Sequence, residues 1–304
     1  MSSPSLFLVR PVHFGFNRET AVDNVFQHGA SDGIDIQALA LAESNGLIEA
    51  LEAHGIPVVV VEDTPEPQTP DSVYPNNWFS SHRDGTLVIY PMFAPNRRQE
   101  RKPAVVARLI AETGASRVID LTGWEKQGKF LEGTGSVVLD REAKVAYACL
   151  SDRTSPEVLA DFCHKMAYRP MPFKGVDPEG RPIYHTNLMM SVGSSFAVLC
   201  REAFVSQEER KAVESSLEAA GKEIVDLSFE QIRHFAANIL EVANRDGERF
   251  ILMSGTARAA LREDQLAVIC RGASVLSAPV PTIETIGGGS VRCMVAELFT
   301  ARAL

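Results

Sequence analysis

Three residues of this sequence carry side chains that together could perform covalent catalysis: Cys293, His185 and Glu132. A thiol attacks as its thiolate, which a nearby His or Arg or clustered backbone N–H groups favour. Cys293 directly follows Arg292 and lies shortly after the glycine run 287–289, which can turn N–H groups toward the sulfur. An imidazole can carry protons, and a carboxylate can stabilise the imidazolium or hold a substrate N–H. The set therefore predicts nucleophilic catalysis through a cysteine.

Each of the three residues also has an ordinary structural interpretation. Cys293 could fill the core, His185 could be a satisfied residue at the head of an apolar strand, and Glu132 could belong to a capped turn. A buried carboxylate is costly without a partner, however. The remaining cysteines lie in apolar or helical patterns, where a buried Cys behaves as a small hydrophobic residue; they are Cys149, Cys163, Cys200 and Cys270.

Composition narrows the classes of partner. The 304 residues are 45% hydrophobic, which is enough to bury a large core. A net charge of -9 without a Lys/Arg-rich stretch disfavours nucleic acid and anionic membranes, so a small molecule is the expected partner. No apolar run approaches the roughly 18 residues of a membrane span, and no signal sequence begins the chain, which predicts a cytoplasmic protein. The odd, scattered cysteines predict neither a disulfide framework nor a metal site.

Short apolar strands alternate with amphipathic helices along the chain. Gly, Asn, Asp or Ser residues bound the strand candidates, which are 6–9, 57–61, 85–91, 135–140, 144–149, 187–192, 195–200, 238–242, 249–253 and 273–276. Helices are predicted at 36–54, 103–114 and 206–221 and from 155 onward. Two Pro-rich polar loops, 62–71 and 174–184, are either surface connections or rims over a pocket.

Polar residues recur at a nearly constant interval. Positions 77, 132, 185, 238 and 293 are separated by 55, 53, 53 and 55 residues, and each precedes an apolar strand. Asn24 lies a further 53 residues before Asn77. If such units close into a ring, equivalent strand ends converge on the central axis, as blades do in a propeller. Glu132, His185 and Cys293 would then meet there, whereas an irregular α+β fold without internal symmetry is the alternative.

Four motifs resemble the guanidine-modifying, or pentein, superfamily, which includes arginine deiminases, dimethylarginine hydrolases and amidinotransferases. They are YPNNWFSSH (74–82), FLEGTGS (130–136), HTN (185–187) and GGGSVRCM (287–294). The segments 10–27 and 96–100 are more similar to the citrulline-utilisation hydrolase branch, often called simply amidinotransferase. The resemblance covers nearly the whole chain. It implies a five-bladed α/β propeller with pseudo-fivefold repeats, formed by residues 1–304 as a single catalytic domain without a metal or organic cofactor.

The resemblance also implies roles for individual residues. Cys293 matches the nucleophile that attacks the central carbon of a guanidino or ureido group, His185 the general acid/base, and Glu132 the carboxylate that holds a substrate nitrogen. Arg97 matches an arginine that binds the α-carboxylate of an amino acid, with Arg98 as its nearby competitor, and an Arg fork suits a carboxylate well.

Two departures from the arginine deiminase pattern change the expected substrate. Those enzymes carry Asp residues at the positions of His82 and Asn187, and the two carboxylates pair with the guanidinium. A buried cation binds well only where opposite charge compensates its lost hydration. A neutral ureido group needs no counter-charge, and its carbonyl oxygen accepts a hydrogen bond from an Asn amide or a His N–H. His82 and Asn187 are therefore predicted substrate contacts. Asn77 is a further candidate contact, with backbone satisfaction as the alternative.

The expected reaction is hydrolysis of citrulline to ornithine, carbon dioxide and ammonia through an S-linked intermediate. Arginine deimination, conversion of arginine to ornithine by two hydrolyses, and transfer of an amidino group to a second amine are the alternatives within the enzyme class. A catalytically silent ring that binds amino acids is the alternative from another class. The sequence does not fix the oligomeric state and leaves a homo-oligomer open.

Overall fold

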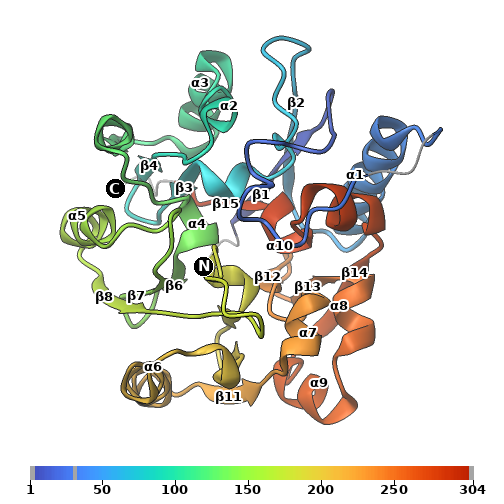
Figure 1. Cartoon of the computed structure of the whole chain (residues 1–304). Coiled ribbons are helices and arrows are strands. Elements are labelled where there is room, and N and C mark those ends of the chain that lie inside the picture. The colour runs from blue at the N-terminus through green and yellow to red at the C-terminus, as the bar shows by residue number, and fades with distance from the viewer. Residues whose placement is uncertain (1–3, 30–32, 301–304) are drawn as a thin grey trace.

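Five three-stranded sheets surround a common centre, with helices at the periphery of the ring (Figure 1). The computed structural model describes residues 4–29 and 33–300. The mixed α/β fold with five repeated units that the sequence predicts is confirmed.

The sheets are built by one rule. A short first strand pairs antiparallel with a second strand, which pairs in parallel with a third. Four sheets follow this order along the chain: β3 (Phe79–Ser81), β4 (Thr86–Ile89) and β5 (Arg117–Asp120); β6 (Val138–Asp140), β7 (Val145–Cys149) and β8 (Arg169–Phe173); β9 (Met190–Val192), β10 (Phe196–Leu199) and β11 (Glu223–Asp226); β12 (Leu240–Ala243), β13 (Arg249–Ser254) and β14 (Ser274–Ala278).

The fifth sheet joins the two ends of the described chain. Its first strand, β15 (Ala296–Leu298), pairs antiparallel with β1 (Ser5–Arg10), and β1 pairs in parallel with β2 (Val58–Glu62). The sheet follows the same rule as the other four, although its strands come from opposite ends of the sequence. This pairing closes the ring.

Helices provide the crossovers that parallel strands require. The crossover helices are α1 (Ile36–Ala53), α3 (Pro103–Thr113), α5 (Pro156–Met166), α6 (Gln207–Ala219), and the pair α8 (Gly255–Ala260) and α9 (Glu263–Ile269). Local sequence sets their starts: Asp35 and Ser206 cap α1 and α6 through their side chains, whereas α3 and α5 begin with proline. Shorter elements are α2 (Pro95–Arg98), α7 (Phe229–Arg233), η2 (Thr122–Gln127), η4 (Arg201–Ala203) and the π-helical turn η5 (Ile283–Gly287).

Short turns at the centre of the ring precede the first strands. They are η1 (Pro75–Asn77), α4 (Gly133–Ser136), η3 (Thr186–Leu188) and α10 (Val291–Met294), and α4 contacts both η1 and η3. The strands expected at 135–140 and 187–192 therefore begin later than predicted, because their first residues form α4 and η3. The recurring polar residues all lie in or beside these turns or just before β12.

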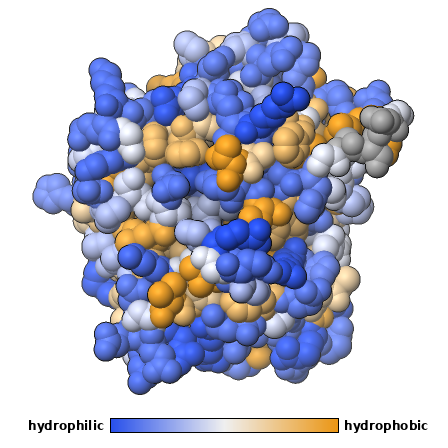
Figure 2. Space-filling model, viewed as in Figure 1, coloured by the Kyte–Doolittle hydropathy of each residue, from blue (hydrophilic) through white to orange (hydrophobic). Residues whose placement is uncertain are grey.

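Apolar clusters extend between neighbouring sheets. Leu47 and Leu51 of α1 are fully buried and belong to the same cluster as Leu252 and Leu276 of β13 and β14. Polar and charged residues cover most of the face in Figure 2, with apolar residues in small groups between them. Within residues 4–29 and 33–300, no helix combines the length and apolar character needed to cross a membrane.

Replacement of Leu47 by Ala tests the packing of α1 against its neighbouring sheets. Leu47 is fully buried, whereas Leu39 in the same helix is 45% exposed. We expect Leu47→Ala to lower the free energy of unfolding by about 2–5 kcal/mol and the matched control Leu39→Ala to change it by less than about 0.5 kcal/mol. Urea unfolding measures both. Equal losses in the two variants would contradict the packing described.

Candidate active site

A small cavity lies beside the central turns, and Cys293 and His185 both line it. The other residues around it are Asn24, Asp71, Tyr74, Asn77, Arg97, Arg153, Tyr184 and the glycines 287–289. The cavity measures about 20 Å³, which is room for about one water molecule. Residues far apart in sequence thus surround one buried point.

Side-chain amides hold the sulfur of Cys293. Asn238 and Asn187 each point an Nδ2 donor at Sγ, at 3.3 and 3.4 Å respectively. The Oδ1 atom of Asn238 accepts from the backbone N–H of Arg292 at 3.1 Å, so the same residue also fixes the turn that carries the cysteine. Donors of this kind stabilise a thiolate.

The glycine run before Cys293 serves close packing and does not supply donors to the sulfur. The N–H of Gly288 donates to the carbonyl of Glu284, and the N–H of Gly289 donates to the hydroxyl of Tyr74. A Cβ atom on Gly287 would lie 2.1 Å from that hydroxyl, and Gly288 has a φ of 67°. The N–H groups of Gly288 and Gly289 are therefore bonded away from the thiol, which corrects the expectation that they turn toward the sulfur.

His185 and Glu132 form a buried hydrogen-bonded pair. The Nε2 atom of His185 lies 2.8 Å from Oε2 of Glu132, and Oε1 accepts from the backbone N–H of Phe93 at 2.9 Å. Burial raises the pKa of Glu132, but Arg153, 3.5 Å away, and the bond to His185 outweigh it and bring the pKa from 4.5 to about 2. Burial lowers the pKa of His185, and Glu132 opposes this shift.

These pKa shifts define the proton positions near neutral pH. Glu132 is ionised and can only accept hydrogen bonds. Neutral His185 therefore carries its proton on Nε2, toward Glu132, and keeps its lone pair on Nδ1. The imidazole is oriented as a base by its carboxylate partner.

Arg97 lines the cavity but is already bound within the protein. Its Nε and Nη2 atoms donate to Glu100 at 2.8 and 3.0 Å, and Nη1 donates to Oδ1 of Asn77 at 2.7 Å. Its competitor Arg98 lies outside the cavity and donates to the carbonyls of Met92 and Phe93. Among the described residues the Nδ2 atom of Asn77 has no partner, so this amide has a donor to offer a ligand.

Arg153 and Asp71 are charged cavity residues that the sequence did not single out. Arg153 is 2% exposed, donates through Nε to Asp23 at 2.8 Å, and lies 4.6 Å from the ring centre of Tyr184. Asp71 accepts from Asn17 at 2.8 Å through Oδ2, while its Oδ1 has no partner in the described part of the chain. Burial raises the pKa of Asp71. The only sequence signal was position, since Asp71 ends the Pro-rich loop 62–71.

The structure places His82 away from the cavity. Its Nε2 atom pairs with Oγ of Ser80 at 2.9 Å, and its ring packs near Phe162 and Tyr168. Burial and the charge of Arg141 lower its pKa, so the ring is neutral. The predicted substrate contact is corrected for a simple reason: β3 carries the chain away from the centre between Asn77 and His82.

The remaining cysteines differ from Cys293 in their surroundings. Burial raises the pKa values of Cys149, Cys163 and Cys200 to about 12, which keeps them as thiols. Cys270 is half-buried. Over residues 4–29 and 33–300, no group of three or more His, Cys, Asp or Glu side chains is arranged to hold a metal ion.

Comparison with known sequences gives a match along nearly the whole chain. The family model described as N,N dimethylarginine dimethylhydrolase, eukaryotic, matches residues 10–300. No curated protein matches the sequence significantly.

Several solved structures share the fold. ArgZ, described as an arginine dihydrolase from the ornithine-ammonia cycle in cyanobacteria, matches 99% of this chain with a TM-score of 0.76 at 18% identity. The match covers 41% of the ArgZ chain. Its isolated N-terminal domain, a cysteine-to-serine mutant bound to substrate, gives a TM-score of 0.75 at 17% identity, with 99% of this chain and 100% of that chain covered.

A third match is a dimethylarginine hydrolase, DDAH from Pseudomonas aeruginosa, solved as a cysteine-to-serine mutant complexed with citrulline. Its TM-score is 0.67 at 16% identity, and the match covers 98% of this chain and 100% of that chain. At these identities the likeness establishes the fold alone.

The His185–Glu132 pair predicts a specific pH dependence of stability. A buried His with a lowered pKa stabilises the fold above its unfolded pKa of about 6.5, and this stability is lost as the pH falls toward the folded value. Glu132→Gln removes the group that raises the pKa of His185. Between pH 7 and 5 we expect the variant to lose about 1 kcal/mol more of its unfolding free energy than the wild type.

Urea unfolding at the two pH values measures this difference. In a His185→Gln background, Glu132→Gln should no longer change the pH dependence, which assigns the effect to the pair. An equal loss between pH 7 and 5 in wild type and Glu132→Gln would contradict the coupling.

Proposed function

Because this chain belongs to the family described as N,N dimethylarginine dimethylhydrolase, eukaryotic, within the guanidine-modifying pentein superfamily, we propose that it hydrolyses C–N bonds at a guanidino or ureido carbon. The observation that carries the proposal is the shared buried cavity of Cys293 and His185, with His185 bonded to Glu132 at 2.8 Å. Residues 1–304 form one catalytic domain in this proposal.

The proposed chemistry proceeds in two halves. His185 takes the proton of the Cys293 thiol, the resulting thiolate attacks the central carbon, a C–S bond forms, and one C–N bond breaks as His185 passes that proton to the departing nitrogen. His185 then removes a proton from water, which adds to the same carbon and breaks the C–S bond. Glu132 stabilises the imidazolium that forms in each half. The asparagine amides on Sγ stabilise the sulfur anion when it attacks and when it leaves.

We infer citrulline as the substrate from the neutral donors around the sulfur. Asn187 and Asn238 supply amide N–H groups next to Sγ, and Asn77 has an unpartnered Nδ2 in the cavity wall. A ureido oxygen accepts such bonds, whereas a guanidinium has no acceptor to offer them. Citrulline and one water then give ornithine, carbon dioxide and ammonia.

One observation favours a second candidate, the conversion of arginine to ornithine by two successive hydrolyses. The free Oδ1 of Asp71 is a buried carboxylate oxygen in the cavity wall, where it can accept from a cationic group. Arginine and two waters would give ornithine, carbon dioxide and two ammonia molecules. Arg97 and Arg153 are the cationic side chains in the same wall, and either would exchange a bond within the protein for the α-carboxylate of a substrate.

Incubation with citrulline, arginine and N,N-dimethylarginine in separate reactions tests the proposal. We expect ornithine and ammonia from citrulline, and complete loss of product with Cys293→Ala because no covalent intermediate can form. Cys270→Ala, a half-buried cysteine outside the cavity, is the matched control and should retain activity. Consumption of arginine alone with accumulation of citrulline would contradict citrulline as the substrate. Dependence on an added amine acceptor would indicate amidino transfer.

Asn187→Asp tests whether the neutral amide at this position favours a neutral substrate over a cationic one. A carboxylate at this position favours a guanidinium and repels the thiolate, so both activities should fall, but citrulline turnover more. We expect the ratio of kcat/KM for citrulline to that for arginine to fall about tenfold. Asn76→Asp changes a buried amide that donates to Thr134 and not to the sulfur, and it should leave the ratio unchanged. An unchanged ratio in Asn187→Asp would refute the role of Asn187 in choosing a neutral group.

A further inference from the structure

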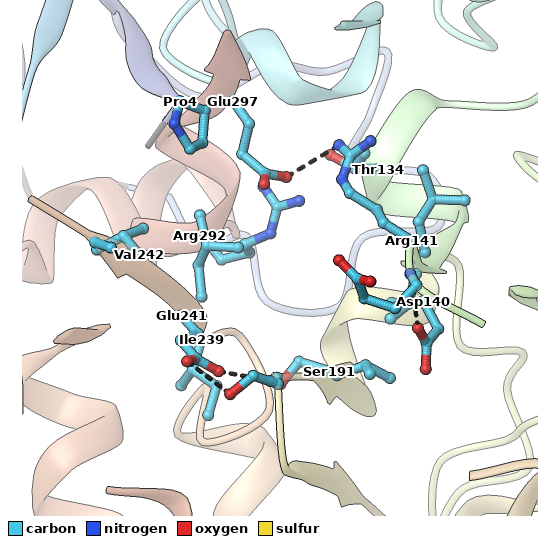
Figure 3. Close-up of a pocket in the computed structure, with 18 of the residues that line it drawn as sticks. Pro4, Thr134, Asp140, Arg141, Ser191, Ile239, Glu241, Val242, Arg292 and Glu297 are labelled. Carbon is cyan, nitrogen blue, oxygen red and sulfur yellow. Dashed lines mark hydrogen bonds and ion pairs between the residues drawn. The ribbon is translucent and has the colours of Figure 1, made fainter. Parts of the chain in front are cut away.

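A second cavity, of about 290 Å³, lies along the ring axis behind the catalytic turns (Figure 3). Its walls include residues of the first strands that follow these turns, among them Asp140 in β6, Ser191 in β9 and Glu297 in β15. Asn187 also lines it and donates to Sγ of Cys293 at 3.4 Å. This side chain therefore contacts the nucleophile and also forms part of the wall of the rear cavity.

The rear cavity carries an excess of positive charge. Its lining holds five cationic side chains and four carboxylates. Four ion pairs account for eight of them: Arg83–Glu142 at 3.5 Å, Arg141–Glu297 at 3.1 Å, Lys222–Asp140 at 3.7 Å and Arg249–Glu241 at 3.2 Å. Arg292 is the fifth cation, and it forms no ion pair with any residue in 4–29 or 33–300. The excess is unlike the whole chain, whose net charge is -9.

Arg292 has donors available at this position. The side chain is 8% exposed, and its Nη1 atom donates to the carbonyl of Val295 at 3.0 Å. Its Nε and Nη2 atoms have no hydrogen-bond partner within the described residues. Figure 3 shows the guanidinium groups of Arg292 and Arg141 reaching into the cavity from opposite walls, with the carboxylate of Glu297 between them. A charge this deeply buried is costly unless it is compensated.

We propose that the rear cavity is a binding site for a small carboxylate anion, held by the free edge of Arg292. A planar carboxylate matches the fork of two guanidinium N–H groups and adds negative charge beside Arg292, which otherwise shares the charge of Glu297 with Arg141. Ser191, whose Oγ is buried without a partner, lies in the same wall and provides a hydroxyl donor. The cavity volume accommodates a carboxylate with a short organic chain.

An anion at Arg292 acts on the nucleophile through charge. Arg292 directly precedes Cys293 in α10, and the charges of the two side chains interact. A bound anion offsets the positive charge that favours the thiolate. Binding at this site is therefore inhibitory: it lowers the reactivity of the catalytic thiol as the carboxylate concentration rises. It does so without filling the small cavity that Cys293 and His185 share.

Two measurements that do not depend on turnover test this site: the thermal midpoint and the rate at which iodoacetamide alkylates Cys293. Sodium acetate is compared with sodium chloride at equal ionic strength. We expect acetate to raise the thermal midpoint by about 2–4 °C and to slow alkylation about threefold relative to chloride. The same effects in chloride would mean simple salt screening and would overturn the proposal.

Two variants locate the effect. Arg292→Gln removes the fork, and Ser191→Leu fills the cavity while keeping Arg292, so both should abolish the response to acetate. Arg262→Gln, an exposed arginine outside the cavity, should keep it. If Arg292→Gln does not fold, the response of Ser191→Leu to acetate tests the rear site. A full acetate response in Ser191→Leu would assign the anion to another place, such as the cavity that Cys293 and His185 share. This result would refute the rear site whatever the substrate proves to be.

Discussion

The buried charge of Glu132 is the constraint on which the centre of the molecule depends. A carboxylate with no exposed surface must be compensated, and here an arginine, an imidazole and a backbone N–H do so from three different parts of the chain. Arg153 is itself buried and needs Asp23 as its partner. Each ion pair or hydrogen bond that compensates a buried charge thus holds a further segment of the chain in place. The position of the proton on His185 follows from the same network.

The ring architecture provides the precision that this network needs. Short turns at the starts of the first strands bring polar side chains to one point, and glycines allow the turns to approach closely. A Cβ atom on Gly135 would lie 2.5 Å from Nδ2 of Asn77 and 2.8 Å from Nδ1 of His185. The side chains at the centre are therefore held by backbone on several sides, which suits a site that must align a nucleophile and a base.

Much of the fold could be predicted from sequence because polar residues and apolar runs recur along the chain at a nearly constant interval. The recurring interval of 53 to 55 residues gave the five units, and the apolar runs gave the long strands and the crossover helices. Short first strands such as β3 and β15 were harder, since three residues carry no periodic signal. His82 was placed at the centre by its match to a family pattern, and a match of this kind does not show that β3 carries the chain away from the centre before His82. Arg153 and Asp71 were missed because their importance lies in contacts made across the ring.

The sheet built from both ends of the chain links catalysis to protein synthesis. The strand after Cys293 pairs with residues near position 5, so contacts in this sheet span almost the entire sequence. On the ribosome, the segment that carries the thiol emerges after the other four sheets are available to form. Pairing of β15 with β1 therefore follows synthesis of the residues that form the other four sheets, and such long-range pairing is intrinsically slow.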